Sequence, residues 1–331
     1  MTTFIGIDGG GTRTRGVVTD AEGRELARVE GGPGLVRSTD PAAGASALAD
    51  LTERLLRAAG LAPPATAICC ALAGAGRAED QMTIAAALQR EAITERIRVV
   101  TDAEAAFHDA FGEGPGILLI AGTGSIALGR NRGEIERTGG WGTLLGDEGS
   151  GYAIGLAALR AAVHAADRRG PETSLLPIIL EHLELASPNQ LIHWMNVAAK
   201  RDIAALAPLV LGAAEEGDFP SIEIVECAAR DLSFHVAAIQ DRLGPWDDHP
   251  KLALTGGLIE PGGPMRELFS QALQEYYRAR FFEAAMEWSV QQGGVTGKGS
   301  ARDLMRVRIA PPIIDQPVDA ARGAAAMARS I

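Results

Sequence analysis

Short apolar runs alternate with helix-spaced patterns in the first third of the chain. Runs rich in Val, Ile, Ala and Phe are typical of strands, and they lie at 4–8, 15–19, 25–29, 68–72 and 97–101. Apolar residues recur at helical spacing over 41–59 and 79–91, and a short helix is expected after Asp102. Three strands followed by alternating helices and strands predict an α/β domain.

The same organisation restarts after the glycine-rich linker 112–116. Strands are expected at 117–121, 126–129, 134–138 and 251–255, long helical segments over roughly 150–243, and an Ala-rich helix at 319–329. A chain of 331 residues exceeds the size of about 250–300 residues at which one core stops growing. We therefore predict two lobes, residues 1–114 and 115–314, followed by a C-terminal helix in 315–331.

Composition narrows the classes of partner. There are 31 Lys and Arg against 42 Asp and Glu, a formal charge of −11, and an acidic chain repels nucleic acid. No apolar run reaches the roughly 18–20 residues that span a bilayer, and no secretory signal is visible, so we expect no membrane partner. Cys69, Cys70 and Cys227 are too few for a disulfide framework or a zinc site, which favours a reducing cytoplasm.

Two glycine loops carry the candidate chemistry. The first, Asp8-Gly9-Gly10-Gly11-Thr12-Arg13-Thr14, follows a strand, and its glycines let backbone N–H groups approach an anion. Thr12 and Thr14 can add hydroxyl donors, and Asp8 can hold the water shell of Mg²⁺. The second, Gly122-Thr123-Gly124, occupies the equivalent place in the second half. The pairing predicts a clamp for nucleotide phosphates, although a glycine-rich hairpin turn would also explain the first loop.

A third glycine pair, Gly256-Gly257, ends the strand at 251–255. Bare backbone there would let a flat ring lie against the chain, but a tight strand-to-helix turn is an equally ordinary explanation.

These segments, with 101–105, resemble in order and spacing the phosphate, connecting and adenosine segments of the acetate kinase, sugar kinase, Hsp70 and actin superfamily. The run 139–150, Gly-Gly-Trp-Gly-Thr-Leu-Leu-Gly-Asp-Glu-Gly-Ser, resembles in particular the branch of N-acetylglucosamine kinases and BadF/BcrA-type ATPases. The resemblance implies two ribonuclease H-like lobes with a cleft between them, and a C-terminal helix in 315–331 that packs back onto the first lobe. It also implies ATP and Mg²⁺ as cofactors, and commonly a homodimer.

The resemblance implies that Asp102 is the general base, taking the proton from the 6-hydroxyl of an amino sugar as that oxygen attacks the γ-phosphorus. A helix N-cap is the alternative role for Asp102. The resemblance also implies sugar contacts from Gly140, Trp141 and Asp147, for which core packing and helix N-terminal charge are the alternatives. Thr12 and Thr123 would contact ATP phosphates, and Ala214 would lie near the nucleoside.

Two departures from the branch affect the acceptor. Leu35 and Ala73 stand where a polar sugar ligand is expected, whereas Arg37 nearby could pair with an acidic substituent such as a lactyl group. We therefore predict a kinase for N-acetylglucosamine, with glucosamine and N-acetylmuramic acid as alternatives. An ATPase activator of the BadF/BcrA type is a different class, but its members hold an iron–sulfur cluster on cysteines that this sequence lacks between Ala71 and Glu226.

Overall fold

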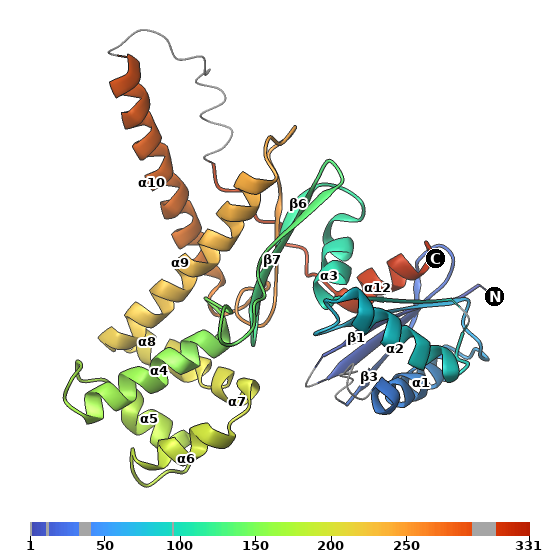
Figure 1. Ribbon diagram of the computed structural model, residues 1–331, viewed down its shortest axis with the longest axis horizontal. Helices are drawn as coiled ribbons and strands as arrows, with labels where there is room; N and C mark the ends of the chain where they lie inside the picture. Colours follow the sequence, from blue (N-terminus) through green and yellow to red (C-terminus); the bar gives the residue numbers. More distant parts are fainter. Residues whose placement is uncertain (1, 11–12, 33–40, 95, 293–308) are drawn as a thin grey trace. The chain divides into compact units, whose positions relative to one another are not determined.

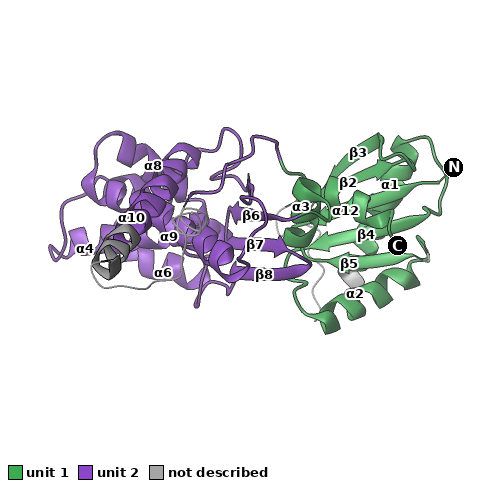
Figure 2. Cartoon of the chain, turned by 90° about the horizontal axis from the view of Figure 1, so that it is seen from above, with its two compact units in different colours: residues 1–114, 318–331 green, residues 115–317 purple. Residues whose placement is uncertain are grey.

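The computed structural model describes residues 2–10, 13–32, 41–94, 96–292 and 309–331. The chain divides into two compact units, shown in different colours in Figure 2. Unit 1 comprises Met1–Gly114 and Val318–Ile331, and unit 2 comprises Pro115–Pro317. That the two units act as the lobes of one enzyme remains a prediction.

The sheet of unit 1 has the strand order β3-β2-β1-β4-β5. Its strands are β1 (Phe4–Gly9), β2 (Thr14–Thr19), β3 (Glu25–Gly31), β4 (Ala67–Leu72) and β5 (Ile97–Val100). The first three form an antiparallel meander, whereas β4 and β5 run parallel to β1. The carboxyl ends of β1, β4 and β5 therefore meet at one edge of the sheet, which is where ligands bind in open α/β sheets.

Helices cover both faces of this sheet. Alternate strand residues point to opposite faces, so Ile5 and Ile7 pack with α1 (Pro41–Ala58) and α2 (Ala78–Arg90). Phe4 and the other alternate positions pack with α3 (Asp102–Phe111) and α12 (Ala320–Ala328). The C-terminal helix thus completes the core that the first 114 residues begin.

Helix α12 lies beside β1 and α3 in Figure 1. A Cβ on Gly6 would lie 2.1 Å from the carbonyl oxygen of Ala321, so only glycine permits this approach of strand and helix. Asp109 of α3 is buried and pairs with Arg322 of α12 through Nη2 at 2.7 Å. These contacts join α12 to the two elements that carry Asp8 and Asp102.

Unit 2 repeats the strand order of unit 1 without its last strand. The sheet runs β8-β7-β6-β9, with β6 (Gly116–Ala121), β7 (Ser125–Asn131) and β8 (Glu134–Gly139) antiparallel and β9 (Leu252–Thr255) parallel to β6. Its helices are α4 (Gly151–Ala166), α5 (Leu175–His182), α6 (Gln190–Val197), α7 (Lys200–Ala204), α8 (Ala207–Glu215), α9 (Phe219–Arg242) and α10 (Arg266–Gln292).

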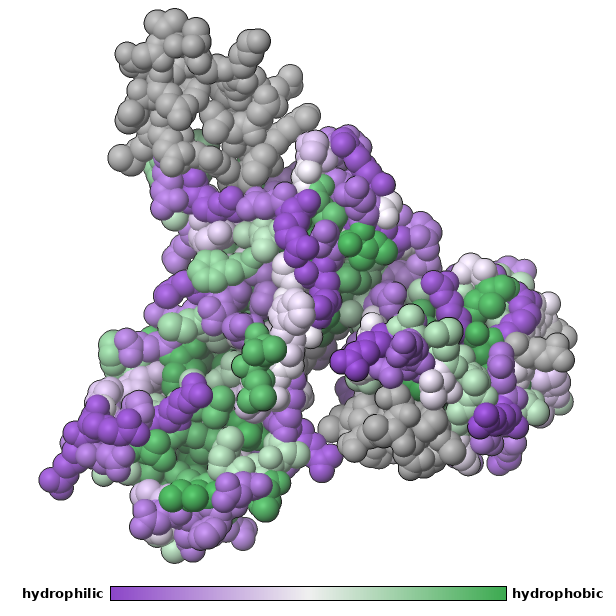
Figure 3. Space-filling model, viewed as in Figure 1, coloured by the Kyte–Doolittle hydropathy of each residue, from purple (hydrophilic) through white to green (hydrophobic). Residues whose placement is uncertain are grey.

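The core of unit 2 lies between its sheet and its helices. Ile117, Leu119 and Ala121 of β6 are fully buried against it, and α9 runs along the sheet (Figure 1). Figure 3 shows hydrophobic residues gathered over the helices α4–α8, and α6 exposes Ile192 and Val197. None of the described helices is long and apolar enough to cross a bilayer.

The predicted elements agree with the structure apart from their ends. Most bounds shift by one residue, and β7 extends to Asn131 because Asn131 pairs with Glu134 beside the turn at 132–133. The helical region 150–243 resolves into six helices from α4 to α9.

Candidate active site

Two carboxylates lie at the carboxyl edge of the unit 1 sheet. Asp8 is the penultimate residue of β1, opposite Arg15 of β2, and Asp102 follows β5 as the first residue of α3. Both side chains are half-buried. Because β1 and β5 are parallel and separated only by β4, their carboxyl ends bring the two acids to the same edge.

Burial governs the electrostatics of this pair. It raises the pKa of Asp8 to about 6, with a further rise from the negative charge of Asp102, while Arg15 opposes the shift. Burial also raises the pKa of Asp102, and the hydrogen bond from the Ala103 amide works in the opposite direction. Two acids held in this way gain from a nearby cation or proton.

Helix α3 starts with a capping box that fixes Asp102. The Thr101 side chain accepts a hydrogen bond from the Glu104 amide at 3.1 Å, and a Glu104 carboxylate oxygen accepts from the Thr101 amide at 2.8 Å. Thr101 is therefore the N-cap, and the alternative that Asp102 serves as the cap is wrong. The Asp102 carboxylate accepts from the Ala103 amide at 2.9 Å and makes no ion pair within the described residues.

The first glycine loop is described only in part. Gly9 ends β1 and accepts a hydrogen bond from the Ala73 amide at 3.1 Å, and the Gly10 amide donates to Arg13 at 3.1 Å. The expectation that Thr14 donates to a phosphate is wrong, because its buried hydroxyl donates to the Gly32 carbonyl at 2.9 Å. Four other positions of the prediction lie outside the described residues: Gly11, Thr12, Leu35 and Arg37.

The second glycine loop is held by the start of α4. The amides of Gly151 and Tyr152 donate to the carbonyl oxygens of Gly122 at 2.8 Å and Thr123 at 3.3 Å. The carbonyl oxygens of Gly122 and Thr123 are therefore hydrogen-bonded to α4. The amides of Thr123 and Gly124 have no hydrogen-bond partner in the described part of the chain. Two such amides beside an exposed threonine hydroxyl can bind an anion.

Gly256 and Gly257 lie against this loop. A Cβ on Gly256, whose φ is +93°, would lie 2.5 Å from the Ala121 carbonyl oxygen, and a Cβ on Gly122 would be 4.0 Å from Gly256 Cα. Gly257 is exposed, and nothing lies within 4 Å of where its Cβ would be. The predicted nucleoside segment and the second phosphate loop are therefore in contact, while Ala214 is half-buried near the end of α8.

Ser125 ties the second glycine loop to the predicted sugar segment. Its hydroxyl donates to the Glu148 carbonyl at 2.6 Å, its amide donates to Asp147 Oδ1 at 3.3 Å, and its carbonyl accepts from the Gly140 amide at 3.0 Å. Asp147 is buried at φ +65° and also accepts from Lys200 Nζ at 2.6 Å. The residues predicted for phosphate and for sugar thus form one hydrogen-bonded assembly inside unit 2.

Trp141 is exposed rather than packed in the core, with 64% of its surface accessible. The core-packing alternative is therefore wrong for this residue. The guanidinium of Arg137 lies 4.7 Å from the centroid of the indole ring and donates to the carbonyls of Gly139 and Gly140. This cation–π contact orients the ring while its other surface stays open.

His235 of α9 supports both ends of the 139–149 loop. A Cβ on Gly139 would lie 2.8 Å from its ring, and its Nε2 lies 4.0 Å from a carboxylate oxygen of Glu148. Burial lowers the pKa of His235, while the charges of Glu148 and Asp231 oppose that shift. Sequence patterns gave no signal for His235 or Lys200, because their partners are distant in the chain. Arg137 is close in sequence to its partners Gly139, Gly140 and Trp141, but it lies just before the run 139–150 and was not singled out.

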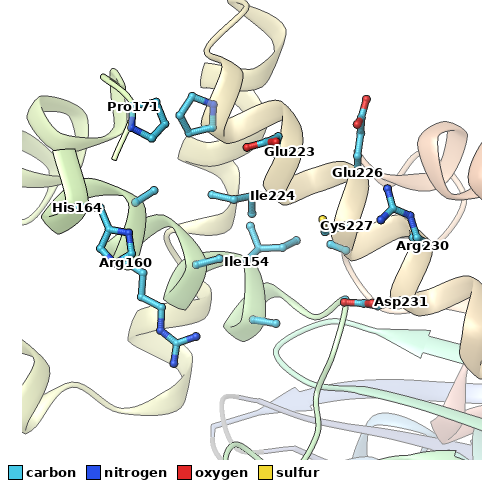
Figure 4. A pocket seen from close by; sticks show the side chains of 16 residues that line it. Ile154, Arg160, His164, Pro171, Glu223, Ile224, Glu226, Cys227, Arg230 and Asp231 are labelled. Carbon is cyan, nitrogen blue, oxygen red and sulfur yellow. The ribbon is translucent and has the colours of Figure 1, made fainter. Parts of the chain in front are cut away.

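Within the described residues, no cluster of three or more His, Cys, Asp or Glu side chains could hold a metal by itself. A cavity of about 620 Å³ lies between α4 and α9 (Figure 4), with Arg160 and His164 on one side and Glu223, Cys227 and Asp231 on the other. None of the residues predicted for nucleotide or sugar lines it. The candidate functional residues therefore form two separate groups, the two carboxylates of unit 1 and the loop assembly of unit 2.

Residues 5–325 match the model of the BadF/BadG/BcrA/BcrD ATPase family. The chain belongs to this family. Among the proteins similar to it, the N-acetylmuramic acid/N-acetylglucosamine kinase of Clostridium acetobutylicum is 37% identical over 263 residues, 78% of this chain and 86% of the relative. The N-acetyl-D-glucosamine kinase of Dictyostelium discoideum is 35% identical over 291 residues, 83% of this chain and 91% of the relative.

A solved structure from Chromobacterium violaceum, described as that of a proposed N-acetylglucosamine kinase, covers 99% of each chain. It is 26% identical, with a TM-score of 0.72. This BadF/BadG/BcrA/BcrD family member therefore has the two-lobed α/β fold of actin-like ATPase sugar kinases, as predicted from its sequence.

Proposed function

We propose that the protein is an ATP-dependent kinase that transfers the γ-phosphoryl group of ATP to the 6-hydroxyl of an amino sugar, N-acetylglucosamine. The observation that carries this proposal is the half-buried carboxylate of Asp102, without an ion-pair partner in the described residues, at the carboxyl edge of a parallel strand. The curated relatives with 35–37% identity, both named as kinases of this sugar, support the choice of acceptor.

In this mechanism Asp102 accepts the proton of the sugar hydroxyl as its oxygen attacks phosphorus. A raised pKa makes the carboxylate a stronger base than a solvated aspartate, and general-base assistance contributes on the order of 10²–10⁴ in rate. The capping box at Thr101 and Glu104 supports this role because it fixes the backbone that carries Asp102.

Asp8 fits Mg²⁺ held largely by phosphates. Mg²⁺ takes oxygen ligands and usually binds through one or two carboxylates plus substrate phosphates, so a site without a larger ligand cluster suits it. When bound, Mg²⁺ would neutralise charge on the transferred phosphoryl group. The elevated pKa of Asp8, about 6, means that its ionised form is costly without a cation, which supports a cation partner.

The remaining candidate residues would bind ATP and the sugar and orient them for the transfer. Gly9–Thr12 and the Thr123 and Gly124 amides would hold phosphate oxygens, with Gly256, Gly257 and Ala214 near the nucleoside. The exposed face of Trp141 would cover the apolar face of the pyranose ring, and Gly140 and Asp147 would contact its hydroxyls. The hydrogen bonds through Ser125 support a common placement of phosphate and sugar ligands.

N-acetylmuramic acid is a second candidate acceptor. The Clostridium acetobutylicum relative is named for both sugars, and Ala73, half-buried beside Gly9, offers no polar group to a sugar. Glucosamine is a third candidate acceptor.

The proposal also includes a homodimer in the cytoplasm, for which the exposed Ile192 and Val197 of α6 offer an apolar surface. Sedimentation equilibrium at micromolar concentration measures the assembly.

A coupled assay of ADP release tests the function with N-acetylglucosamine, glucosamine, N-acetylmuramic acid and glucose. We expect turnover with an N-acetylated amino sugar and loss of kcat by about 10²–10⁴ in Asp102→Asn, with sugar binding retained. Glu79→Gln is the matched control, an exposed acid in the first turn of α2. No turnover with any sugar would reject the kinase, and a brown, iron-containing protein would favour the ATPase activator.

A further inference from the structure

Lys200 places a cation beside the second glycine loop. Its Nζ donates to Asp147 Oδ2 at 2.6 Å, and a Cβ on Gly124 would lie 2.9 Å from the same nitrogen. The ammonium therefore sits against bare backbone where any other residue at position 124 would displace it. The Lys200 side chain is 35% exposed and that of Asp147 is 4% exposed, so the ammonium remains accessible from one side.

Further hydrogen-bond donors lie on the glycine loop beside this ammonium. An ammonium group has three N–H donors, and one of them is used by Asp147. The amides of Thr123 and Gly124 have no partner in the described residues, and the Thr123 side chain is exposed. Two amides and a hydroxyl on the loop, with the ammonium of Lys200 from the start of α7 beside Gly124, can bind a phosphate group.

Lysine is rare in this protein. The sequence has three lysines, Lys200, Lys251 and Lys298, while arginine supplies nearly all other positive charge. A chain with a net charge of −11 disfavours a polyphosphate until local cations offset the repulsion. Lys200 lies beside the glycine loop, where a positive charge would offset the repulsion between the acidic chain and a polyphosphate.

We propose that Lys200 is a phosphate-binding residue of the nucleotide site, held beside Gly124 by Asp147. This inference rests on the proposed kinase function. Asp147 becomes a positioning residue for the lysine, and because its Oδ1 and Oδ2 each accept one protein donor, it keeps lone pairs for a sugar hydroxyl. Lys200 thereby links nucleotide and sugar binding through one carboxylate.

The test measures nucleotide affinity without sugar, so it does not depend on the acceptor. The non-hydrolysable ATP analogue AMP-PNP is titrated by calorimetry and adenosine by NMR. Lys200→Met should weaken AMP-PNP binding about 10- to 100-fold, the usual worth of a hydrogen bond to a charged group, and change adenosine affinity less than about twofold. Lys200→Arg should retain most of the affinity, and Lys251→Met, an exposed lysine before β9, should match the wild type.

Lys200→Met leaves a buried carboxylate unpaired and could impair folding. The double variant Asp147→Asn/Lys200→Met removes both charges and should show the same loss of AMP-PNP binding. Unchanged AMP-PNP affinity, or an equal loss for adenosine, would overturn the role of Lys200. Wild-type protein that binds AMP-PNP but phosphorylates no sugar would reject the kinase alone, whereas wild-type protein that binds no AMP-PNP would reject both proposals.

Discussion

Gly323 of α12 lies directly against Ala105 of α3, and a Cβ on Gly323 would sit 1.9 Å from the Ala105 carbonyl oxygen. Since Ala105 is three residues from Asp102, this contact sets how close α12 comes to the helix that carries the proposed base. The approach is backbone to backbone, so neither partner can rotate away.

Gly323→Ala should therefore destabilise unit 1 by about 2–4 kcal/mol, because the added methyl group forces the two helices apart. Gly212→Ala is the matched control, since Gly212 also lies within a helix and nothing lies within 4 Å of its Cβ position. Alanine there should stabilise by about 0.5–1 kcal/mol. Urea denaturation measures both, and equal effects of the same sign would contradict the packing argument.

Asp8→Asn should stabilise the ligand-free protein while removing activity. The folded-state pKa of Asp8, about 6, exceeds the unfolded value of 3.8, so the folded state binds more protons between these values and stability falls as pH rises through the window. We expect a gain of about 1–2 kcal/mol at pH 7.5, less than the full shift implies because the group is partly solvated, shrinking to about half at pH 5.

The control for this prediction is Asp50→Asn, an exposed acid on α1 with 69% of its side chain accessible. It should change the free energy of unfolding by less than about 0.5 kcal/mol at either pH. A loss of stability in Asp8→Asn at pH 7.5, or a gain that grows toward pH 5, would show that burial does not govern this carboxylate.

Gly124→Ala should reduce kcat/KM by about 10- to 100-fold with little loss of stability. The new Cβ would lie 2.5 Å from Asp147 Oδ1 and 2.9 Å from Lys200 Nζ, so both charged groups must shift. Misplacement of binding groups by about 1 Å is enough for such an effect. Gly76→Ala is the comparison, as its Cβ position is open. Steady-state kinetics with both substrates varied measures kcat/KM for each variant. Equal values for Gly124→Ala and Gly76→Ala would contradict the displacement of Asp147 and Lys200.

Trp141→Ala should raise the KM for the sugar about tenfold and leave the KM for ATP within about twofold, because a ring contact of an aromatic side chain contributes about 0.5–1.5 kcal/mol. Its 64% exposure means that unfolding should change little. Ile135→Ala removes a similarly exposed apolar side chain, 60% accessible, from the same β8 region. A rise in KM for both substrates would assign Trp141 a structural role instead.

Glycine loops and strand ends were predictable from the sequence because each is a local pattern. An apolar strand that ends in Asp8 and glycines, or in Gly122 and Gly124, is such a pattern. The contact of Gly256 with the second loop was not predicted, because it depends on the pairing of β6 with β9, in which Leu119 lies opposite the distant Leu254. The capping box also lies within four residues, and its Thr-x-x-Glu pattern at 101–104 is a local signal that favours Thr101 over Asp102 as the cap.

The supporting residues could not be predicted in the same way. Lys200 reaches Asp147 across 53 residues, and His235 meets Gly139 and Glu148 from a helix nearly 90 positions later. Thr14 looked available as a donor because its acceptor, the Gly32 carbonyl, belongs to a different strand end. Such partners arise from tertiary packing, which leaves no periodic or compositional trace in one sequence.

The distribution of the thiols has a practical consequence. Cys69 and Cys70 are fully buried in β4 of unit 1, where burial raises the pKa of both thiols, whereas Cys227 of unit 2 is exposed. A maleimide reagent should therefore modify Cys227 at once and reach the other two only when β4 separates from its neighbours. The rate at which Cys69 and Cys70 are modified therefore reports how often unit 1 opens. Mass spectrometry can follow this rate without an engineered label.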